Sequence, residues 1–282
     1  MAIKSFEREL ECMLECMVDV AQEATRVIKH TRQSKKSTRK KDKTILTNGD
    51  LRSSEKIREM ISARFPEYGL IIEEENRDYK EDLEKEKIFV WDPLDGSRVV
   101  GGGLGEDYGV IGGSLVKIRG VYVPVAGVTV NIPKGEIVYA RMGAGAFYRK
   151  GERSYRMLMR EPSDFSVVVS SSRRSPELQR ILEQLEVEPD QVRLMSSSLK
   201  AIEVAMSRAS LYVCPRESPM SLWDLCGIDL IVREAKGRFT DLSGEQFDYQ
   251  ELIKNPTNRR GVLVGSKVAH KYALERIRQL EE

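Results

Sequence analysis

W-D-P-L-D-G-S, at residues 91–97, places two carboxylates three positions apart, with a proline between them and a glycine directly after. Proline fixes its own φ and has no N–H for a neighbouring strand, so a strand that ends at Trp91 is expected to turn here and bring Asp92 and Asp95 together. Two carboxylates suit a Mg²⁺-like cation, which shares its other positions with water and substrate phosphate. The N–H groups that follow can hold that phosphate. A surface turn is the alternative, and this segment alone supports both equally.

Two further acidic segments favour the metal site. An apolar run ends in three acids at L-I-I-E-E-E, residues 70–75, and like charges at one strand end are costly unless a cation neutralises them. A solvated acidic loop is the alternative. We assign Glu73, the acid nearest the strand, as a ligand, and Glu75 to the loop. Asp224, in L-W-D-L-C-G-I, lies where a helix N-cap is expected, and a capping residue can also bind a metal.

Composition and charge exclude several other classes of protein. The chain has 282 residues, of which 40% are hydrophobic, and a formal net charge of +2, which argues against nucleic acid as a partner. No apolar run approaches the roughly 18 residues of a membrane span, and no signal-peptide pattern is present, so we expect a cytoplasmic protein. The four cysteines lack zinc-type spacing, and we expect them to be reduced and structural. With only two histidines, a histidine-based nucleophilic triad is not expected.

Hydrophobic periodicity predicts a mixed α/β chain in two parts. Residues 6–30 and 50–65 read as amphipathic helices, and alternating segments after the glycine-rich residues 101–105 predict an antiparallel meander. From Ser166 onward, strands alternate with helices, which is typical of an α/β fold. We predict an α+β domain over residues 1–162, which carries most metal ligands, and an α/β domain over residues 163–282. The meander strands are expected at 108–116, 121–130 and 136–140, and the later elements as a strand from 166, a helix from 176, a strand near 192, a helix at 199–209, a strand at 211–214 and a helix from 224.

These motifs together resemble the inositol monophosphatase superfamily of Mg²⁺-dependent, lithium-sensitive sugar and nucleotide phosphatases. Five elements carry the resemblance in the family's order: L-T-N-G-D ending at Asp50, the acidic strand end at Glu73 and Glu74, W-D-P-L-D-G-S, W-D-L-C-G at residues 223–227, and E-A-K-G before Arg238. The resemblance implies a layered α-β-α-β-α sandwich of the inositol monophosphatase/fructose-1,6-bisphosphatase type, with the metal site between the halves. A homodimer is compatible with it, because related phosphatases occur as monomers, dimers and tetramers.

The resemblance also implies roles for individual residues. Two or three Mg²⁺ ions would be bound by Glu73, Asp92, the carbonyl of Leu94, Asp95 and Asp224. Asp50 and Ser97 would orient and deprotonate the attacking water, Ser97 standing where threonine is commoner. Glu74 would support a third site or the water. The basic residues 32–43 correspond to a mobile loop near that third site, although such a run is more often simply solvated.

Segments in the second half resemble the 3′(2′),5′-bisphosphate nucleotidases. They are S-S-S-L-K at residues 196–200 and Y-V-C-P-R-E-S-P-M-S-L-W-D at 212–224. Cations there would suit a substrate with two phosphates, although each could be an ordinary surface charge. The chain departs from that subtype with R-V-V-G-G-G at residues 98–103, with Ser196 for a glycine, and with Lys236 for a glycine in E-A-G-G. The predicted substrate-binding residues are Gly96, Ser97, Arg173, Ser197, Ser198, Lys200 and Arg216.

The sequence therefore predicts a Mg²⁺-dependent phosphomonoesterase for a small phosphorylated metabolite. Adenosine 3′,5′-bisphosphate is the first choice of substrate, with inositol 1-phosphate and fructose 1,6-bisphosphate as alternatives. A hypothesis of another class is a catalytically silent relative that binds phosphorylated ligands or RNA and acts as a regulator. The complete set of expected metal carboxylates argues against that hypothesis.

Overall fold

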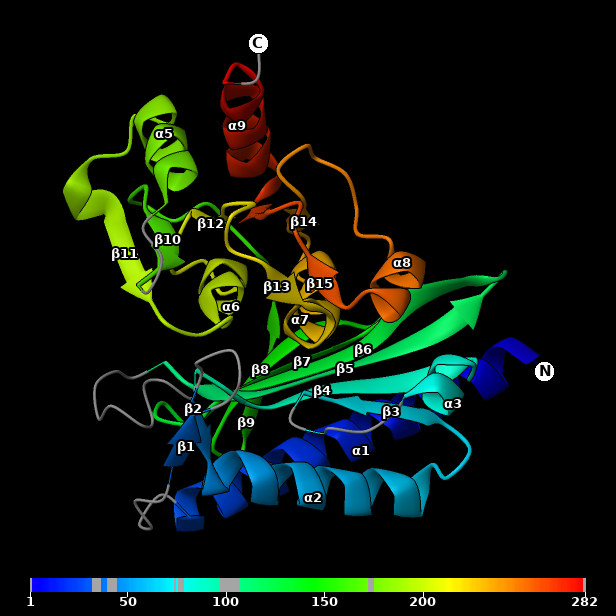
Figure 1. The fold of residues 1–282 in the computed structure, drawn as a ribbon. Coiled ribbons are helices and arrows are strands. Elements are labelled where there is room, and N and C mark those ends of the chain that lie inside the picture. The colour runs from blue at the N-terminus through cyan, green and yellow to red at the C-terminus, as the bar shows by residue number, and fades with distance from the viewer. Residues whose placement is uncertain are drawn as a thin grey trace.

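Layers of helices and sheets alternate through the molecule, which confirms the predicted α-β-α-β-α sandwich (Figure 1). The computed structural model describes residues 2–31, 37–39, 45–73, 75, 79–96, 107–171 and 175–280. From one side to the other, the layers are α1 and α2, a seven-stranded sheet, the helices α6, α7 and α8, a five-stranded sheet, and finally α5 and α9. The helices are α1 (Ala2–Thr31), α2 (Asn48–Arg64), α3 (Lys80–Leu83), α5 (Pro176–Gln184), α6 (Lys200–Ala205), α7 (Leu222–Glu234), α8 (Tyr249–Lys254) and α9 (Lys267–Arg278).

The first layer forms because α1 and α2 each present an apolar stripe to the large sheet. Leu10, Met13 and Met17 of α1 are almost fully buried, together with Ile57 of α2, against Trp91 and its neighbours on one face of the sheet. These positions recur at helical spacing, and burying such side chains is the dominant favourable term in folding. Both predicted helices are confirmed.

The seven-stranded sheet is an antiparallel meander with one parallel strand at its edge, in the order β3-β4-β5-β6-β7-β8-β9. Only the β3–β4 pair is parallel. The predicted meander is therefore confirmed. The strands are β3 (Gly69–Ile72), β4 (Lys87–Asp95), β5 (Gly109–Ile118), β6 (Val121–Asn131), β7 (Glu136–Arg141), β8 (Gly145–Lys150) and β9 (Arg153–Met157).

The prediction that the strand ends at Trp91 was wrong, because β4 continues to Asp95. Its pairing with β5 is interrupted between Asp92 and Asp95, where the register shifts. Pro93 lies inside this interval and has no N–H for the ladder, so the irregularity is the local response to proline rather than the end of the strand.

The five-stranded sheet mixes parallel and antiparallel pairs in the order β11-β10-β12-β16-β14. Strand β10 is parallel to both of its neighbours, whereas β16 is antiparallel to β12 and β14. The alternation of strands and helices predicted for this half is confirmed. The division into two domains at residue 162 stays a prediction. The remaining strands are β1 (Ser37–Arg39), β2 (Ile45–Thr47), β10 (Val167–Ser170), β11 (Val192–Met195), β12 (Leu211–Cys214), β13 (Met220–Ser221), β14 (Arg238–Thr240), β15 (Thr257–Asn258) and β16 (Val262–Gly265), with a short 3₁₀ turn at Pro189–Gln191.

Helix α7 approaches the large sheet so closely that glycine backbone lies against glycine backbone. A Cβ atom built on Gly227 would lie 2.1 Å from the carbonyl oxygen of Gly112, and one built on Gly127 would lie 2.2 Å from the carbonyl oxygen of Gly227. No real Cβ atom tolerates such distances. The three glycines therefore fix the separation of α7 from β5 and β6.

Ion pairs tie helix α6 and the turn after it to the large sheet. Arg208, which follows α6, donates to both carboxylate oxygens of Glu136 on β7, at 2.8 and 2.9 Å. Glu203 of α6 is almost fully buried and pairs with Lys134 at 3.1 Å. Nearby cations hold the pKa of the Glu136 and Glu203 carboxyls below their usual value, despite the opposing effect of burial. Helix α6 and the turn after it are thus held against the first half of the chain.

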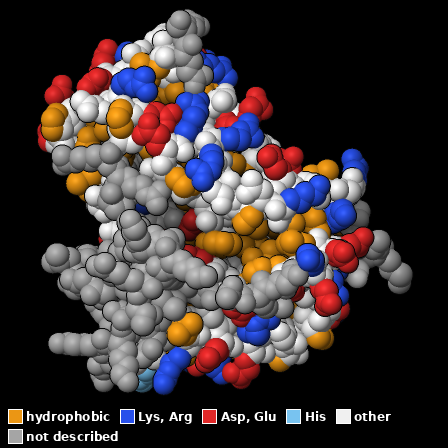
Figure 2. All heavy atoms as spheres, in the orientation of Figure 1, with side chains coloured by type: hydrophobic (Ala, Val, Ile, Leu, Met, Phe, Trp, Pro, Cys, Tyr) orange, Lys and Arg blue, Asp and Glu red, His pale blue; other side chains and the backbone are white. Residues whose placement is uncertain are grey.

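Charged groups of both signs are interspersed over the face of the molecule in Figure 2.

All four cysteines are free, but Cys12 is exposed, so the expectation that every cysteine is structural was wrong for that residue. Cys16 lies one turn further along α1 and is buried, with the side chain of Arg64 from α2 close to its thiol. No helix among the described residues is both long and apolar enough to cross a membrane.

Lys236 lies just beyond the end of α7 in the left-handed region, with a φ of 72°. The N–H groups of Lys236 and Gly237 donate to the carbonyls of Arg233 and Val232, both at 2.9 Å, which is the helix ending that favours glycine at the left-handed position. Lys236→Gly is expected to raise the free energy of unfolding by about 0.5–1 kcal/mol, because a side chain is strained there. Urea unfolding measures the change.

A matched control replaces a lysine in a regular helix. Lys271 is exposed in α9 and is not among the described residues with positive φ. Lys271→Gly should lower the free energy of unfolding by about 1 kcal/mol, because glycine is a poor helix former. The strain account of Lys236 fails if both variants shift stability in the same direction.

Candidate metal centre

Three aspartates from two distant parts of the chain converge on one point. One carboxylate oxygen from each of Asp92, Asp95 and Asp224 lies within 4.8 Å of the others. Asp92 and Asp95 stand at the end of β4 and are buried, whereas Asp224 is half-buried in the first turn of α7. The predicted convergence is confirmed in geometry, and it joins the large sheet to the middle helices.

Local bonds orient the two carboxylates of β4. The N–H of Leu94 donates to Oδ1 of Asp92 at 2.9 Å, a bond that crosses the irregular part of the strand. Gly96 then leaves the strand with a φ of 82°, and a Cβ atom there would lie 3.0 Å from the carbonyl oxygen of Asp107. Glycine is required at this position by both its conformation and its surroundings.

Asp224 is the third residue of α7 and not its N-cap, as the sequence suggested. The helix begins at Leu222 after the cap residue Ser221, whose N–H donates to Oδ2 of Asp224 at 2.9 Å. The carboxylate therefore completes the capping interaction from inside the helix. It also benefits from the positive end of the helix dipole, which stabilises an anion in the first turn.

Burial and mutual repulsion shape the electrostatics of the cluster. Burial first, and then the neighbouring Glu73, raise the pKa of Asp92 well above its ordinary value. Burial and the charge of Asp224 likewise raise the pKa of Asp95 to about 7. The nearby positive charge of Lys200 opposes the rise in the pKa of Asp95.

The donor set fits Mg²⁺. Each aspartate offers hard carboxylate oxygens, and the group within reach contains neither a thiol nor an imidazole, the softer ligands that favour zinc or copper. A divalent cation would also neutralise the charges that burial and repulsion otherwise make costly.

Glu73 and Asp50 lie where α2 and β3 meet this part of β4. The N–H of Glu73 donates to the carbonyl of Trp91 at 3.0 Å, so the acid directly follows β3 beside Asp92. Asp50 is fully buried in the first turn of α2. The hydroxyl of Ser53, one turn on, reaches the carbonyl of Pro93 at 3.4 Å. Their predicted roles in metal binding and water activation stay predictions.

Several predicted residues fall outside the described part of the chain. They are Glu74, Ser97 and Arg173, together with the segment 98–103 and the basic residues 32–36 and 40–43. Glu75, which the sequence assigned to the loop, forms an ion pair with Arg58 of α2.

The predicted substrate residues of the second half are engaged with the protein itself. Lys200 is almost fully buried and donates to the carbonyl of Ser197. Burial lowers its pKa, while the nearby carboxylates oppose that effect. The main-chain N–H and guanidinium of Arg216 both donate to the carboxylate of Glu177, at 2.6 and 2.8 Å. Lys200 is therefore withdrawn from solvent, whereas Arg216 stays partly exposed, and their contact with substrate stays a prediction.

Sequence reasoning missed Asp107, which lies two residues before the start of β5. Its Oδ2 accepts from the N–H groups of Ser196 and Ser197, the latter at 3.2 Å. The contact joins residues about ninety positions apart, and no motif around Asp107 marks it. Only the fold brings these residues together.

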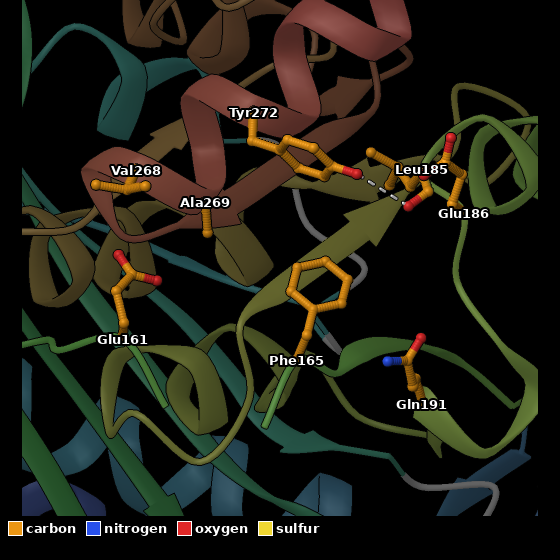
Figure 3. A pocket seen from close by; sticks show the side chains of 8 residues that line it. All are labelled: Glu161, Phe165, Leu185, Glu186, Gln191, Val268, Ala269 and Tyr272. Carbon is orange, nitrogen blue, oxygen red and sulfur yellow. Dashed lines mark hydrogen bonds between the residues drawn. The ribbon is translucent and has the colours of Figure 1, made fainter. Parts of the chain in front are cut away.

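A cavity of about 390 Å³ lies at the other end of the molecule, between α5, α9 and the small sheet (Figure 3). Its two aromatic rings, Phe165 and Tyr272, meet edge to face at 6.3 Å. None of its described lining residues is a predicted site residue. This cavity is therefore separate from the metal centre.

The raised pKa of Asp95 makes the effect of Mg²⁺ depend on pH. In the metal-free protein, a carboxyl whose pKa is raised to about 7 costs stability as it ionises, so stability falls as pH rises from the ordinary value of 3.8 towards 7. Mg²⁺ binds the ionised form and competes with protons. The increase in Tm that Mg²⁺ produces should be larger at about pH 8.5 than at about pH 5.5. An increase that is equal at the two pH values would contradict this account.

Comparison with known proteins identifies the family to which the chain is similar. A model of the inositol monophosphatase family matches residues 9–282. The histidinol-phosphatase of Chlorobaculum parvum is 31% identical over 210 residues, which cover 73% of this chain and 76% of that protein. The 3′(2′),5′-bisphosphate nucleotidase CysQ of Salmonella typhimurium is 28% identical over 229 residues, which cover 77% of this chain and 85% of that protein.

Among solved structures, an IMPase/NADP phosphatase complexed with Mg²⁺ and phosphate superposes with a TM-score of 0.74 over 95% of both chains, at 18% identity. At this identity the likeness shows the fold alone. The family match covers almost the whole chain, and the three aspartates supply the oxygen ligands that Mg²⁺ prefers. The chain therefore belongs to the inositol monophosphatase family and is a Mg²⁺-dependent phosphatase.

Proposed function

We propose that this phosphatase removes the 3′-phosphate of adenosine 3′,5′-bisphosphate. The observation that carries the proposal is the contact between the carboxylate cluster and the S-S-S-L-K segment that resembles the bisphosphate nucleotidases. The N–H of Ser198 donates to Asp95 at 2.6 Å, so this segment lies directly beside the metal centre. A curated relative that matches over 77% of the chain carries the name of such a nucleotidase.

The residues of the cluster suggest how the reaction would proceed. Asp92, Asp95 and Asp224, with Glu73 and the carbonyl of Leu94, would hold two or three Mg²⁺ ions. Bound Mg²⁺ supplies Lewis-acid activation of the attacking water and stabilisation of the leaving oxygen. Asp50, buried at the start of α2, would orient the attacking water together with the hydroxyl of Ser97, and the Asp50 carboxylate would accept the proton of that water.

The substrate would lie between the carboxylates and the second half of the chain. Its reacting phosphate would meet the N–H of Gly96 at the end of β4. Its second phosphate would replace Glu177 as the partner of Arg216. The guanidinium of Arg216 is partly exposed and contacts Glu177 at 2.8 Å. An arginine can form paired bonds with phosphate as readily as with a carboxylate.

The alternatives differ in the molecule that carries the phosphate. Inositol 1-phosphate and fructose 1,6-bisphosphate remain candidates, and histidinol phosphate joins them because a 31% identical relative is named for it. A silent regulator that binds a phosphorylated ligand or RNA is the candidate of another class.

The deciding experiment measures the Mg²⁺-dependent release of inorganic phosphate from these four esters. The proposal predicts the highest kcat/KM for adenosine 3′,5′-bisphosphate, with no release in EDTA. A higher kcat/KM for another ester would replace the substrate but keep the phosphatase. No release from any ester, with tight binding of RNA or of a phosphorylated ligand, would favour the regulator. The same preparation carrying Asp92→Asn controls for contaminating phosphatases.

A further inference from the structure

Three successive main-chain N–H groups, those of Ser196, Ser197 and Ser198, all donate to carboxylates. The first two donate to the same oxygen of Asp107, and the third donates to Oδ2 of Asp95 at 2.6 Å. The segment before α6 is thus pinned to two acids of the first half of the chain. Its position relative to the metal centre is fixed by bonds from the backbone.

Ser198 also uses its side chain on the cluster. Its hydroxyl donates to Oδ1 of Asp224 at 3.2 Å, and the residue is almost completely buried. One residue therefore contacts two of the three clustered carboxylates, Asp95 on β4 and Asp224 on α7. It does so with two different donors, one from the main chain and one from the side chain.

These bonds leave Ser198 without a hydrogen-bond donor for a phosphate. A phosphate dianion accepts hydrogen bonds, whereas both donors of Ser198 are already committed to carboxylates. The expected role in substrate binding is therefore replaced by another. We propose that Ser198 is a positioning residue of the metal centre, whose hydroxyl holds Asp224 in the orientation that binds Mg²⁺.

The physical reason lies in the repulsion within the cluster. Three carboxylates within 4.8 Å of one another repel, and the half-buried Asp224 can turn its carboxylate towards water. The N–H of Ser221 restrains one oxygen, and the hydroxyl of Ser198 restrains the other. Partners that orient a ligand in this way commonly change metal affinity by about 10-fold or more when removed. The inference rests on the Mg²⁺ centre and not on the choice of substrate.

The two tryptophans of the chain offer a direct readout. Trp91 and Trp223 each directly precede a clustered aspartate, so intrinsic fluorescence should respond when Mg²⁺ binds. Ser198→Ala removes the hydroxyl but keeps the N–H that donates to Asp95. We expect its dissociation constant for Mg²⁺ to rise about 10-fold without substrate present. Ser198→Thr, which restores a hydroxyl, should recover most of the affinity.

Ser196, two positions before Ser198, provides the matched control. The hydroxyl of Ser196 contacts that of Ser171 at 3.1 Å, away from the aspartates, so Ser196→Ala should bind Mg²⁺ as the wild type does. Thermal unfolding in EDTA should give similar Tm values for both alanine variants. Unchanged Mg²⁺ affinity in Ser198→Ala, or an equal loss in Ser196→Ala, overturns the proposal.

A kinetic measurement separates this role from contact with substrate. On whichever ester the protein hydrolyses, Ser198→Ala should recover nearly wild-type kcat and KM when Mg²⁺ is raised to saturation. A KM that stays elevated at saturating Mg²⁺ would show that the hydroxyl binds substrate, which refutes the proposal. Because the fluorescence titration needs no substrate, it reports on Ser198 even if the proposed nucleotidase activity fails.

Discussion

Asp92→Asn should abolish phosphatase activity while leaving the protein folded. Asp92 is almost fully buried, and it is the clustered acid whose pKa responds to Glu73, Asp95 and Asp224 alike. An amide cannot supply the charge that holds the cation. We expect kcat/KM to fall about a thousandfold or more, which corresponds to about 4 kcal/mol of lost transition-state stabilisation. Phosphate release at saturating Mg²⁺ measures the loss.

The same substitution should not destabilise the metal-free protein. The amide oxygen can still accept from the N–H of Leu94, and removal of the charge relieves the repulsion that raises the pKa of Asp92. In EDTA we expect a Tm equal to or above that of the wild type, and no further rise on addition of Mg²⁺.

A control variant separates this effect from a general loss of acid. Asp190 is exposed in the 3₁₀ turn before β11, so Asp190→Asn should retain both the activity and the Mg²⁺ response. Near-normal turnover in Asp92→Asn would refute the assignment of the three aspartates as the metal centre. A lower Tm in EDTA would refute only the account of charge repulsion.

Gly227→Ala should destabilise the protein and weaken Mg²⁺ binding together. Helix propensity alone predicts the opposite sign, because alanine is favoured over glycine inside a helix by about 1 kcal/mol. The new methyl group would lie 2.1 Å from the carbonyl oxygen of Gly112, however, and backbone there cannot move without disturbing β5. We expect a net loss of about 3 kcal/mol in the free energy of unfolding. Asp224, three residues earlier on α7, should shift with the helix, so the dissociation constant for Mg²⁺ should rise.

Gly135→Ala is the appropriate comparison. Gly135 has a φ of 63° in the turn before β7, and nothing lies within 4 Å of a Cβ atom there. The substitution should cost about 1 kcal/mol through backbone strain alone and should leave Mg²⁺ binding unchanged. If Gly227→Ala proves as stable as the wild type, then the glycine contact does not set the position of α7.

The convergence of three aspartates could be predicted because short motifs carry them. Asp92 and Asp95 lie in one turn-forming segment, and Asp224 precedes a long apolar stretch, so their chemistry is visible locally. The fold could also be predicted from the sequence, because its helical and alternating hydrophobic patterns are strong. The exact ends of the strands and helices were harder to predict from the sequence. Strand β4 passes through Pro93 because a bulge absorbs the missing N–H, and α7 starts before Asp224 because Ser221 caps it.

Contacts between distant segments could not be predicted. Asp107 carries no motif, and its bonds to Ser196 and Ser197 exist only because the small and large sheets are brought together. The serines of S-S-S-L-K were visible as a motif, but their main-chain N–H groups turned out to face carboxylates rather than solvent. Sequence spacing predicts which groups are available, whereas the tertiary fold decides which partners they find first.

Helix α7 is covered on both sides, since nine of its thirteen residues are buried between the two sheets. A helix in that position cannot fray or tilt without opening the hydrophobic core that it shares with both sheets, so its backbone should be among the slowest in the molecule to exchange amide hydrogens. Catalytic side chains are more commonly carried by surface loops. Asp224 of the candidate metal centre lies instead on a helix that we expect to be among the stiffest elements, so we expect any rearrangement that admits substrate or releases product to come from other segments of the chain.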